Sequence, residues 1–398
     1  TGDIAESYDF FRYGVKADIN DTFSVGILYD EPFGAAAEYT QSNFVSQGDV
    51  DASIASITNG AAPSLAAAQA GIGALAAGET AGVLTPAQQA QLDGLRGAVA
   101  VAQAEASTAG ENTNVEVRSQ SLTGILGMKF GANKNFQIYG GPVAQRTQSE
   151  TKLRGLAYGP ASGYTSNSNP DMDYGYIAGI AYSKPEIALK AALTYRSEID
   201  HDIQISESYP LVAIRATAAG ATPEQAAAAA NRNSKYEITT PKSVNFDFQT
   251  GINPTTLATA KVRWVPWSDF VITPPLYNDT SKISYGPDGL NLVEYKDDQW
   301  QVELGLAKRL APALAVSGTV GWDSGAGNPV TSLGPVEGYY SVGLGAKYNV
   351  TENWAVSVGG KYLWFGDAQG QLPTGKIVAD FEDNDGYIAG VKLSYQGK

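Results

Sequence analysis

The stretches YSVGLGAKY, Tyr340–Tyr348, and WAVSVGGKYLW, Trp354–Trp364, decide the fold class of this chain. In both, large apolar or aromatic residues recur at alternate positions, and Gly, Ser, Ala or Lys lies between them. A period of two places successive side chains on opposite faces of a β-strand. The short turn Asn349–Asn353 joins the two stretches, so we expect an antiparallel hairpin.

The same alternation runs through the rest of the chain and gives about thirteen strands. Their connections alternate between tight turns and long polar loops. We expect tight turns near residues 20, 133, 185, 254, 311 and 351, and long loops over 40–113, 157–171, 207–235, 273–290, 324–336 and 366–376. This pattern is typical of an all-β transmembrane antiparallel β-barrel. A soluble β-sandwich, the alternative, gives no reason for connection lengths to alternate.

Composition narrows the class further. The chain has 398 residues, 43% hydrophobic, yet no apolar run approaches the roughly 18 residues that a membrane-spanning helix needs. Acidic residues outnumber basic ones, 41 to 27, which argues against a nucleic-acid partner because phosphate attracts a cationic surface. The chain has no cysteine, so disulfides and thiolate metal sites are excluded.

Two long loops carry helix signals, and we treat residues 1–398 as one barrel with two inserts. Residues 40–113 are Ala-rich and contain Thr85-Pro86, and residues 207–235 contain Thr222-Pro223; Thr before Pro is an N-cap pattern. Helical inserts in long connections are expected on the extracellular side.

Single-chain bacterial barrels have an even number of strands, so about thirteen strands predict a fourteenth. Because the connection at Asn20-Asp21 is tight, we expect Thr1 at the end that carries the long loops. The expected missing element is a first strand that precedes Thr1.

Three segments resemble the FadL/TodX-type outer-membrane transporters of long-chain fatty acids and hydrocarbons. They are ALTYRSEI at Ala192–Ile199, PKSV at Pro241–Val244 and VRWVPWSDF at Val262–Phe270. The resemblance covers most of the chain except the Ala-rich insert. It implies a bacterial outer-membrane location and contact with outer-membrane lipid and lipopolysaccharide. It also implies an N-terminal hatch, and neither that hatch nor the first strand has a counterpart in this sequence.

The resemblance also implies a lateral opening at a kinked third strand. We assign that strand to Phe23–Gly34 and the kink to Asp30, Glu31, Pro32, Phe33 and Gly34. Independently of the family, Pro32 cannot donate a ladder hydrogen bond, and Gly34 weakens pairing or permits a bulge. The alternative is that Pro32 simply ends the strand at a loop.

Cationic residues predicted to face the lumen are candidates for holding the carboxylate of a fatty acid. We select Arg196, Arg263, Lys190 and Lys361, and favour the two arginines because they lie in the family-like segments. Ion pairs that crosslink the lumen are the alternative role for each.

No catalytic residue, metal ligand or cofactor site is predicted. His201 is the only histidine, and we interpret it as a surface group beside acidic neighbours; no Gly-x-Ser-x-Gly turn is present. The acidic cluster Asp380–Gly386 lacks the spacing of an EF-hand and reads as a solvated face.

The sequence therefore predicts passive diffusion of fatty acids or other hydrophobic small molecules through the lumen and a lateral opening. The alternative is a structural or surface-interaction barrel whose helical insert mediates assembly. A packed, charge-crosslinked lumen would favour the alternative, and an apolar tunnel would favour transport. The sequence carries no signal for the oligomeric state.

Overall fold

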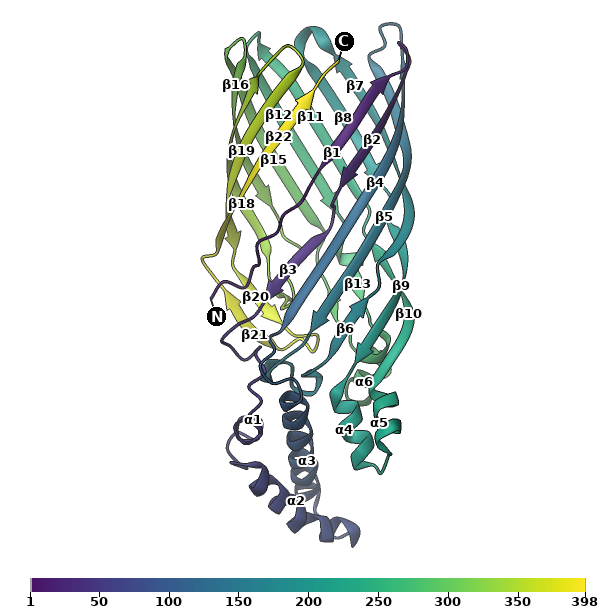
Figure 1. Ribbon diagram of the computed structural model, residues 1–398. Helices are drawn as coiled ribbons and strands as arrows, with labels where there is room; N and C mark the ends of the chain where they lie inside the picture. Colours follow the sequence, from purple (N-terminus) through teal and green to yellow (C-terminus); the bar gives the residue numbers. More distant parts are fainter. Residues whose placement is uncertain (1, 398) are drawn as a thin grey trace.

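The computed structural model describes residues 2–397, and one seventeen-stranded sheet curved into a tall barrel dominates it (Figure 1). The strands of this sheet are β1 (Tyr13–Asp18), β2 (Phe23–Asp30), β3 (Gly34–Glu38), β4 (Asn114–Phe130), β5 (Phe136–Lys152), β6 (Thr165–Ser168), β7 (Asp171–Lys184), β8 (Leu189–Arg196), β9 (Ile199–Ser208), β10 (Asn231–Thr240), β11 (Ser243–Asn253), β12 (Thr256–Val265), β15 (Gln299–Ala311), β16 (Leu314–Asp323), β18 (Glu337–Asn349), β19 (Trp354–Gly366) and β22 (Asp385–Tyr395). Neighbouring strands of this sheet pair antiparallel, as the tight turns predict.

Four consecutive pairs are each a single crossing of the wall interrupted by two or three residues: β2/β3, β6/β7, β8/β9 and β10/β11. The seventeen strands, less these four interruptions, make thirteen crossings among residues 2–397. The two edge strands of the sheet are β1, paired with β2, and β22, paired with β19. No ladder joins β1 to β22 within that range, and Thr1 lies outside the described residues.

The apolar face of the sheet points away from the barrel axis. On β18 the side chains of Tyr340, Leu344 and Tyr348 are exposed, whereas Ser341 is buried. Cross-strand partners repeat the pattern, since Val342 lies opposite Tyr362. Hydrocarbon, and not a protein core, is the environment that suits such a surface.

The tight turns lie at one end of the barrel, which we call the turn end, and the long loops lie at the other, which we call the loop end (Figure 1). At the turn end, Asn20 accepts the backbone N–H groups of Thr22 and Phe23 at 2.8 Å, which fixes the turn between β1 and β2. Lys134 and Ala188 adopt positive φ angles of 55° and 53° in two other tight turns. The helices lie at the loop end.

The long loops pack together over the loop end. Their core contains Tyr39, Phe44, Tyr158 and Tyr277, all buried. The Tyr39 hydroxyl donates to the Ser332 carbonyl at 2.5 Å, which joins the first long loop to one far along the chain. Small strands contribute: β13 (Val271–Ile272) pairs with β14 (Val293–Glu294), and β20 (Ala368–Gln371) pairs with β17 (Val330–Thr331) and β21 (Ile377–Phe381).

Six α-helices of the described chain belong to these loops: α1 (Val50–Ile57), α2 (Leu65–Thr80), α3 (Pro86–Ala106), α4 (Pro210–Ala218), α5 (Pro223–Ala230) and α6 (Pro275–Tyr285). Thr85 and Thr222 cap α3 and α5 with complete capping boxes, so the two Thr-Pro signals mark helix starts. In the first insert the buried Glu105 carboxylate accepts the Ser53 hydroxyl at 2.7 Å and ties α3 to α1. No helix among residues 2–397 is long and apolar enough to cross a membrane.

Candidate functional site

A cavity of about 480 Å³ lies inside the loop end of the barrel, and we call it the loop-side cavity. Its walls come from many strands and from the packed loops. Apolar side chains dominate them, including Phe33, Val117, Ile203, Trp267 and Phe270. Such a volume and lining suit a small hydrophobic molecule.

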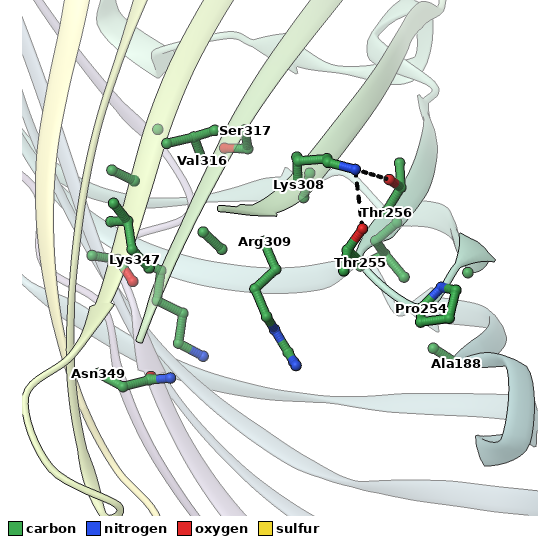
Figure 2. Close-up of a pocket in the computed structure, with 18 of the residues that line it drawn as sticks. Ala188, Pro254, Thr255, Thr256, Lys308, Arg309, Val316, Ser317, Lys347 and Asn349 are labelled. Atoms are coloured by element: carbon green, nitrogen blue, oxygen red, sulfur yellow. Dashed lines mark hydrogen bonds between the residues drawn. The ribbon is translucent and has the colours of Figure 1, made fainter. Parts of the chain in front are cut away.

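A second cavity, of about 560 Å³, lies at the turn end, and we call it the turn-side cavity (Figure 2). Lys308, Arg309 and Lys347 line it, and Lys308 donates to the Thr255 hydroxyl at 3.0 Å. Its cationic rim and its position among the tight turns resemble an open mouth. The loop-side cavity is the better candidate for holding an apolar solute.

The interruption between β2 and β3 borders the loop-side cavity. Pro32, Phe33 and Gly34 line it. β2 and β3 pair with the same strand, β4: Asp30 lies opposite Ser121, and Gly34 lies opposite Arg118. The chain advances four residues from Asp30 to Gly34, whereas β4 advances only three from Ser121 to Arg118. One extra residue on one strand is the geometry of a β-bulge. Pro32 therefore does not end the crossing, because the chain resumes the same wall position in β3.

Ser119 stabilises the bulge from the facing strand. Its hydroxyl donates to the Phe33 carbonyl at 2.6 Å and accepts the Phe33 N–H at 2.7 Å. The bulged backbone thus obtains from a side chain the hydrogen bonds that the ladder would otherwise provide.

Arg196 and Asp30 lie beside this bulge on the inner face of the wall. The Arg196 guanidinium is 3.5 Å from the Asp30 carboxylate and donates to the Ser121 hydroxyl at 2.8 Å. Both charged side chains are mostly buried, with 16% and 23% of their surface exposed. Asp30 is the last residue of β2, so the ion pair fixes the point at which the bulge begins.

Arg263 lies close to Arg196. Arg196 is on β8 and Arg263 is on β12, the two strands that flank β11. Arg196 lies opposite Ser243 of β11, and Arg263 lies opposite Asn245. Arg263 interacts electrostatically with both Arg196 and Asp30. Among residues 2–397 Arg263 makes no ion pair within 4.0 Å, and Asp30 is the carboxylate that interacts electrostatically with both guanidinium groups. This excess of positive charge suits an anion.

The other two predicted cations lie elsewhere. Lys361 forms an ion pair with Glu303, the crosslinking role considered as its alternative. Lys190 lies opposite Gln249, which lines the turn-side cavity. The structure thus brings the two arginines together and separates them from the two lysines.

His201 is fully buried, so its interpretation as a surface group is wrong. Gln145 donates to the ring Nε2 at 3.0 Å, because an amide nitrogen has no acceptor capacity. The ring Nδ1–H therefore donates to the Asp171 carboxylate, also at 3.0 Å. Gln145 Oε1 accepts from Ser121 at 3.3 Å and faces Arg196 at 3.5 Å. A continuous polar network, Asp171–His201–Gln145–Arg196–Asp30, results.

One residue group in the described chain has ligand atoms close enough for a metal ion: Asp171, Asp173 and His201, whose atoms lie within 4.8 Å of one another. Both ring nitrogens of His201 already have protein partners. The network gives this histidine a structural role, and sequence spacing gave no signal for it, because its partners come from β5 and β7.

Comparison with known proteins gives a family. A family model described as "Outer membrane protein transport protein (OMPP1/FadL/TodX)" matches residues 11–396. The chain belongs to the OMPP1/FadL/TodX family. A sequence comparison with curated proteins gives no match. This family member is thus an outer-membrane protein, and its family comprises transport proteins and not enzymes.

Solved structures share the fold. A Pseudomonas aeruginosa FadL homologue is 14% identical, with a TM-score of 0.61 over 96% of this chain and 77% of that chain. The Pseudomonas putida toluene transporter TodX is 10% identical, with a TM-score of 0.51 over 98% of this chain and 82% of that chain. At these identities the similarity shows the FadL/TodX barrel architecture.

Proposed function

We propose that this FadL/TodX-family protein transfers hydrophobic small molecules, including long-chain fatty acids, by passive diffusion. The solute enters from the helical loops, which we place on the extracellular side, and occupies the loop-side cavity. It leaves sideways through the wall between Asp30 and Gly34. The observation that carries this proposal is the contact between an apolar cavity and an interrupted strand.

Arg196 and Arg263 supply the group that recognises a carboxylate. Arg196 pairs with Asp30 at the start of the bulge, and Arg263 lies opposite Gln301, which lines the loop-side cavity. A fatty acid bound with its carboxylate at the arginines would keep its chain in the loop-side cavity. A hydrocarbon would use the cavity without the arginines.

The alternative function, a structural barrel whose insert mediates assembly, has one feature in its favour. The insert has its own small core, formed by Ile54, Ala68, Leu95 and neighbouring alanines, and it projects from the loop end (Figure 1). The loop-side cavity supports transport over this alternative, because a purely structural barrel has no use for an apolar interior volume.

Uptake by cells that lack their own FadL-type transporter tests the proposal. Expression of this protein should accelerate entry of labelled oleate and toluene. Gly34→Trp should abolish the gain, because the indole fills the interruption. Gly390→Trp is the matched control, since an added Cβ there meets open space and the residue lies on β22, which pairs with β19 and not with β2, β3 or β4. No acceleration by the wild-type protein, or full uptake with Gly34→Trp, would overturn it.

A further inference from the structure

The wall is open beside the β2/β3 bulge, on the side that faces the N-terminal segment. β1 pairs with β2 as far as Tyr13 opposite Tyr29. An isolated bridge then joins Ala5 to Ala37. Ala5 lies eight positions before Tyr13, and Ala37 lies eight positions after Tyr29. The N-terminal segment and the β2/β3 crossing therefore stay in register. Between them no ladder forms among the described residues, and we call this opening, between residues 7–12 and 30–35, the wall gap.

Hydrogen bonds bound the wall gap on both sides. At the loop end, the Glu38 N–H donates to the Ile4 carbonyl at 3.0 Å, and the Glu6 N–H donates to the Ala36 carbonyl at 3.3 Å. Toward the turn end, the Phe11 N–H donates to the Glu31 carboxylate at 2.7 Å, a side-chain contact in place of a ladder bond. The gap is therefore a bounded opening and not a frayed terminus.

Tyr8 occupies the wall gap. In the shared register it lies opposite Gly34, and its ring and hydroxyl take the space that a Cβ on Gly34 would need. The Arg118 guanidinium lies 5.3 Å from the ring centroid in a cation–π contact, and Arg118 is itself paired with Glu116. Gly34 also lines the loop-side cavity, so Tyr8 packs on a residue that borders that cavity.

We infer that Tyr8 sets the width of the lateral exit, and thereby the rate and size selectivity of solute release. The inference rests on the proposed function, because it assigns a residue to the exit step. Tyr8 is held by one cation–π contact and by packing on a glycine, and neither contact belongs to the sheet. Such a ring can move without breaking a ladder hydrogen bond.

Substitutions at position 8 should change uptake in opposite directions. Tyr8→Ala removes the ring and should raise the initial rate of oleate uptake severalfold, whereas Tyr8→Trp should lower it. Tyr13→Ala is the matched control, because Tyr13 lies in the same segment but in the intact ladder. Gly34→Ala should act on uptake by displacing the Tyr8 ring. The effect of Gly34→Ala on the uptake rate should therefore vanish in the Tyr8→Ala background.

Crosslinking tests closure directly, because the chain contains no cysteine of its own. Tyr8→Cys/Gly34→Cys, bridged by a short bis-methanethiosulfonate, should block uptake until a reductant cleaves the bridge. Val15→Cys/Ile27→Cys, a pair in the β1–β2 ladder, should be insensitive to the same treatment. Heat-modifiable migration on gels verifies that each variant forms a folded barrel.

The outcomes separate this inference from the proposed function. If the wild-type protein accelerates oleate uptake but the Tyr8 variants and the bridged pair behave like it, the inference is overturned and the proposed function survives. If the wild-type protein accelerates nothing, both fall. Opposite effects of Ala and Trp at position 8, with reversible block of the bridged pair, would support the inference.

Discussion

Arg196 and Asp30 pair across 3.5 Å at the ends of two interrupted strands: Arg196 is the last residue of β8, and Asp30 is the last residue of β2. The second carboxylate oxygen of Asp30 is buried and has no hydrogen-bond partner within residues 2–397. On the proposed function, Asp30 is the counter-ion that an incoming carboxylate would replace.

Asp30→Asn should therefore strengthen fatty-acid binding. The substitution keeps the shape of the side chain and removes the charge that competes for Arg196 and Arg263. We expect the Kd for oleate to fall roughly tenfold, equivalent to about 1.4 kcal/mol, with little change for toluene. Fluorescence displacement on the purified protein in detergent measures both. Equal affinity for oleate in Asn and Asp forms would show that Asp30 does not compete with the ligand.

Arg263→Gln should weaken fatty-acid binding selectively. A charge-assisted hydrogen bond contributes about 1.5–3 kcal/mol, so the affinity for oleate should fall by about tenfold or more, while that for toluene stays the same. Lys347→Gln is the control, because it removes one positive charge from the turn-side cavity instead. A similar loss in both variants would point to a diffuse effect of charge and against recognition at Arg263.

His201→Leu should destabilise the barrel, because it leaves Gln145 Nε2 with one partner fewer and removes the donor to Asp171. Loss of a partner by a buried polar group costs about 1–3 kcal/mol. The midpoint of urea unfolding, followed by gel mobility, should shift downward. Asp202→Asn, on the exposed face of the same strand, should leave the midpoint near that of the wild type.

The helical insert should respond to acid. The Arg96 guanidinium, through its hydrogen bonds, holds the pKa of Glu79 below its usual value and thereby joins α2 to α3. A lowered folded-state pKa means that the stabilisation is present above the ordinary value, about 4.3, and is lost as the pH falls through the folded pKa. Spin labels at Gly73→Cys and Gly97→Cys should show a broader distance distribution at pH 3 than at pH 7.

Glu79→Gln supplies the control for this pH effect. The neutral amide does not titrate, so the distance distribution should be broad at both pH values. A wild-type distribution that is unchanged at pH 3 would show that other contacts hold the two helices together.

Period-two alternation and the lengths of the connections are sufficient to predict the strands of the barrel wall. Both patterns follow from a barrel whose outer surface faces the membrane. Strand register decided how much of the site could be predicted. The sequence predicts both Arg196 and Arg263 as cations that face the lumen. Their proximity depends on the pairing of β8 and β12 with β11, which no local pattern encodes.

The roles of His201 and Tyr8 could not be predicted for related reasons. Acidic neighbours in the sequence made His201 resemble a surface group, whereas its actual partners lie on β5 and β7. Tyr8 precedes the first regular strand and belongs to no periodic segment. Its position depends on a register that continues across an open stretch of ladder.

The level of the wall gap on the barrel has a consequence for the destination of the solute. On β4 the outward side chains change from charged Glu116 and Arg118 to apolar Leu122 and Leu126. Gly34 lies opposite Arg118, so the wall gap lies where the outer face changes from charged to apolar side chains. Unpaired backbone is tolerated there because water reaches it, but not deeper in the hydrocarbon. A fatty acid leaving at this depth would keep its carboxylate hydrated while its tail enters the leaflet nearer the loop end.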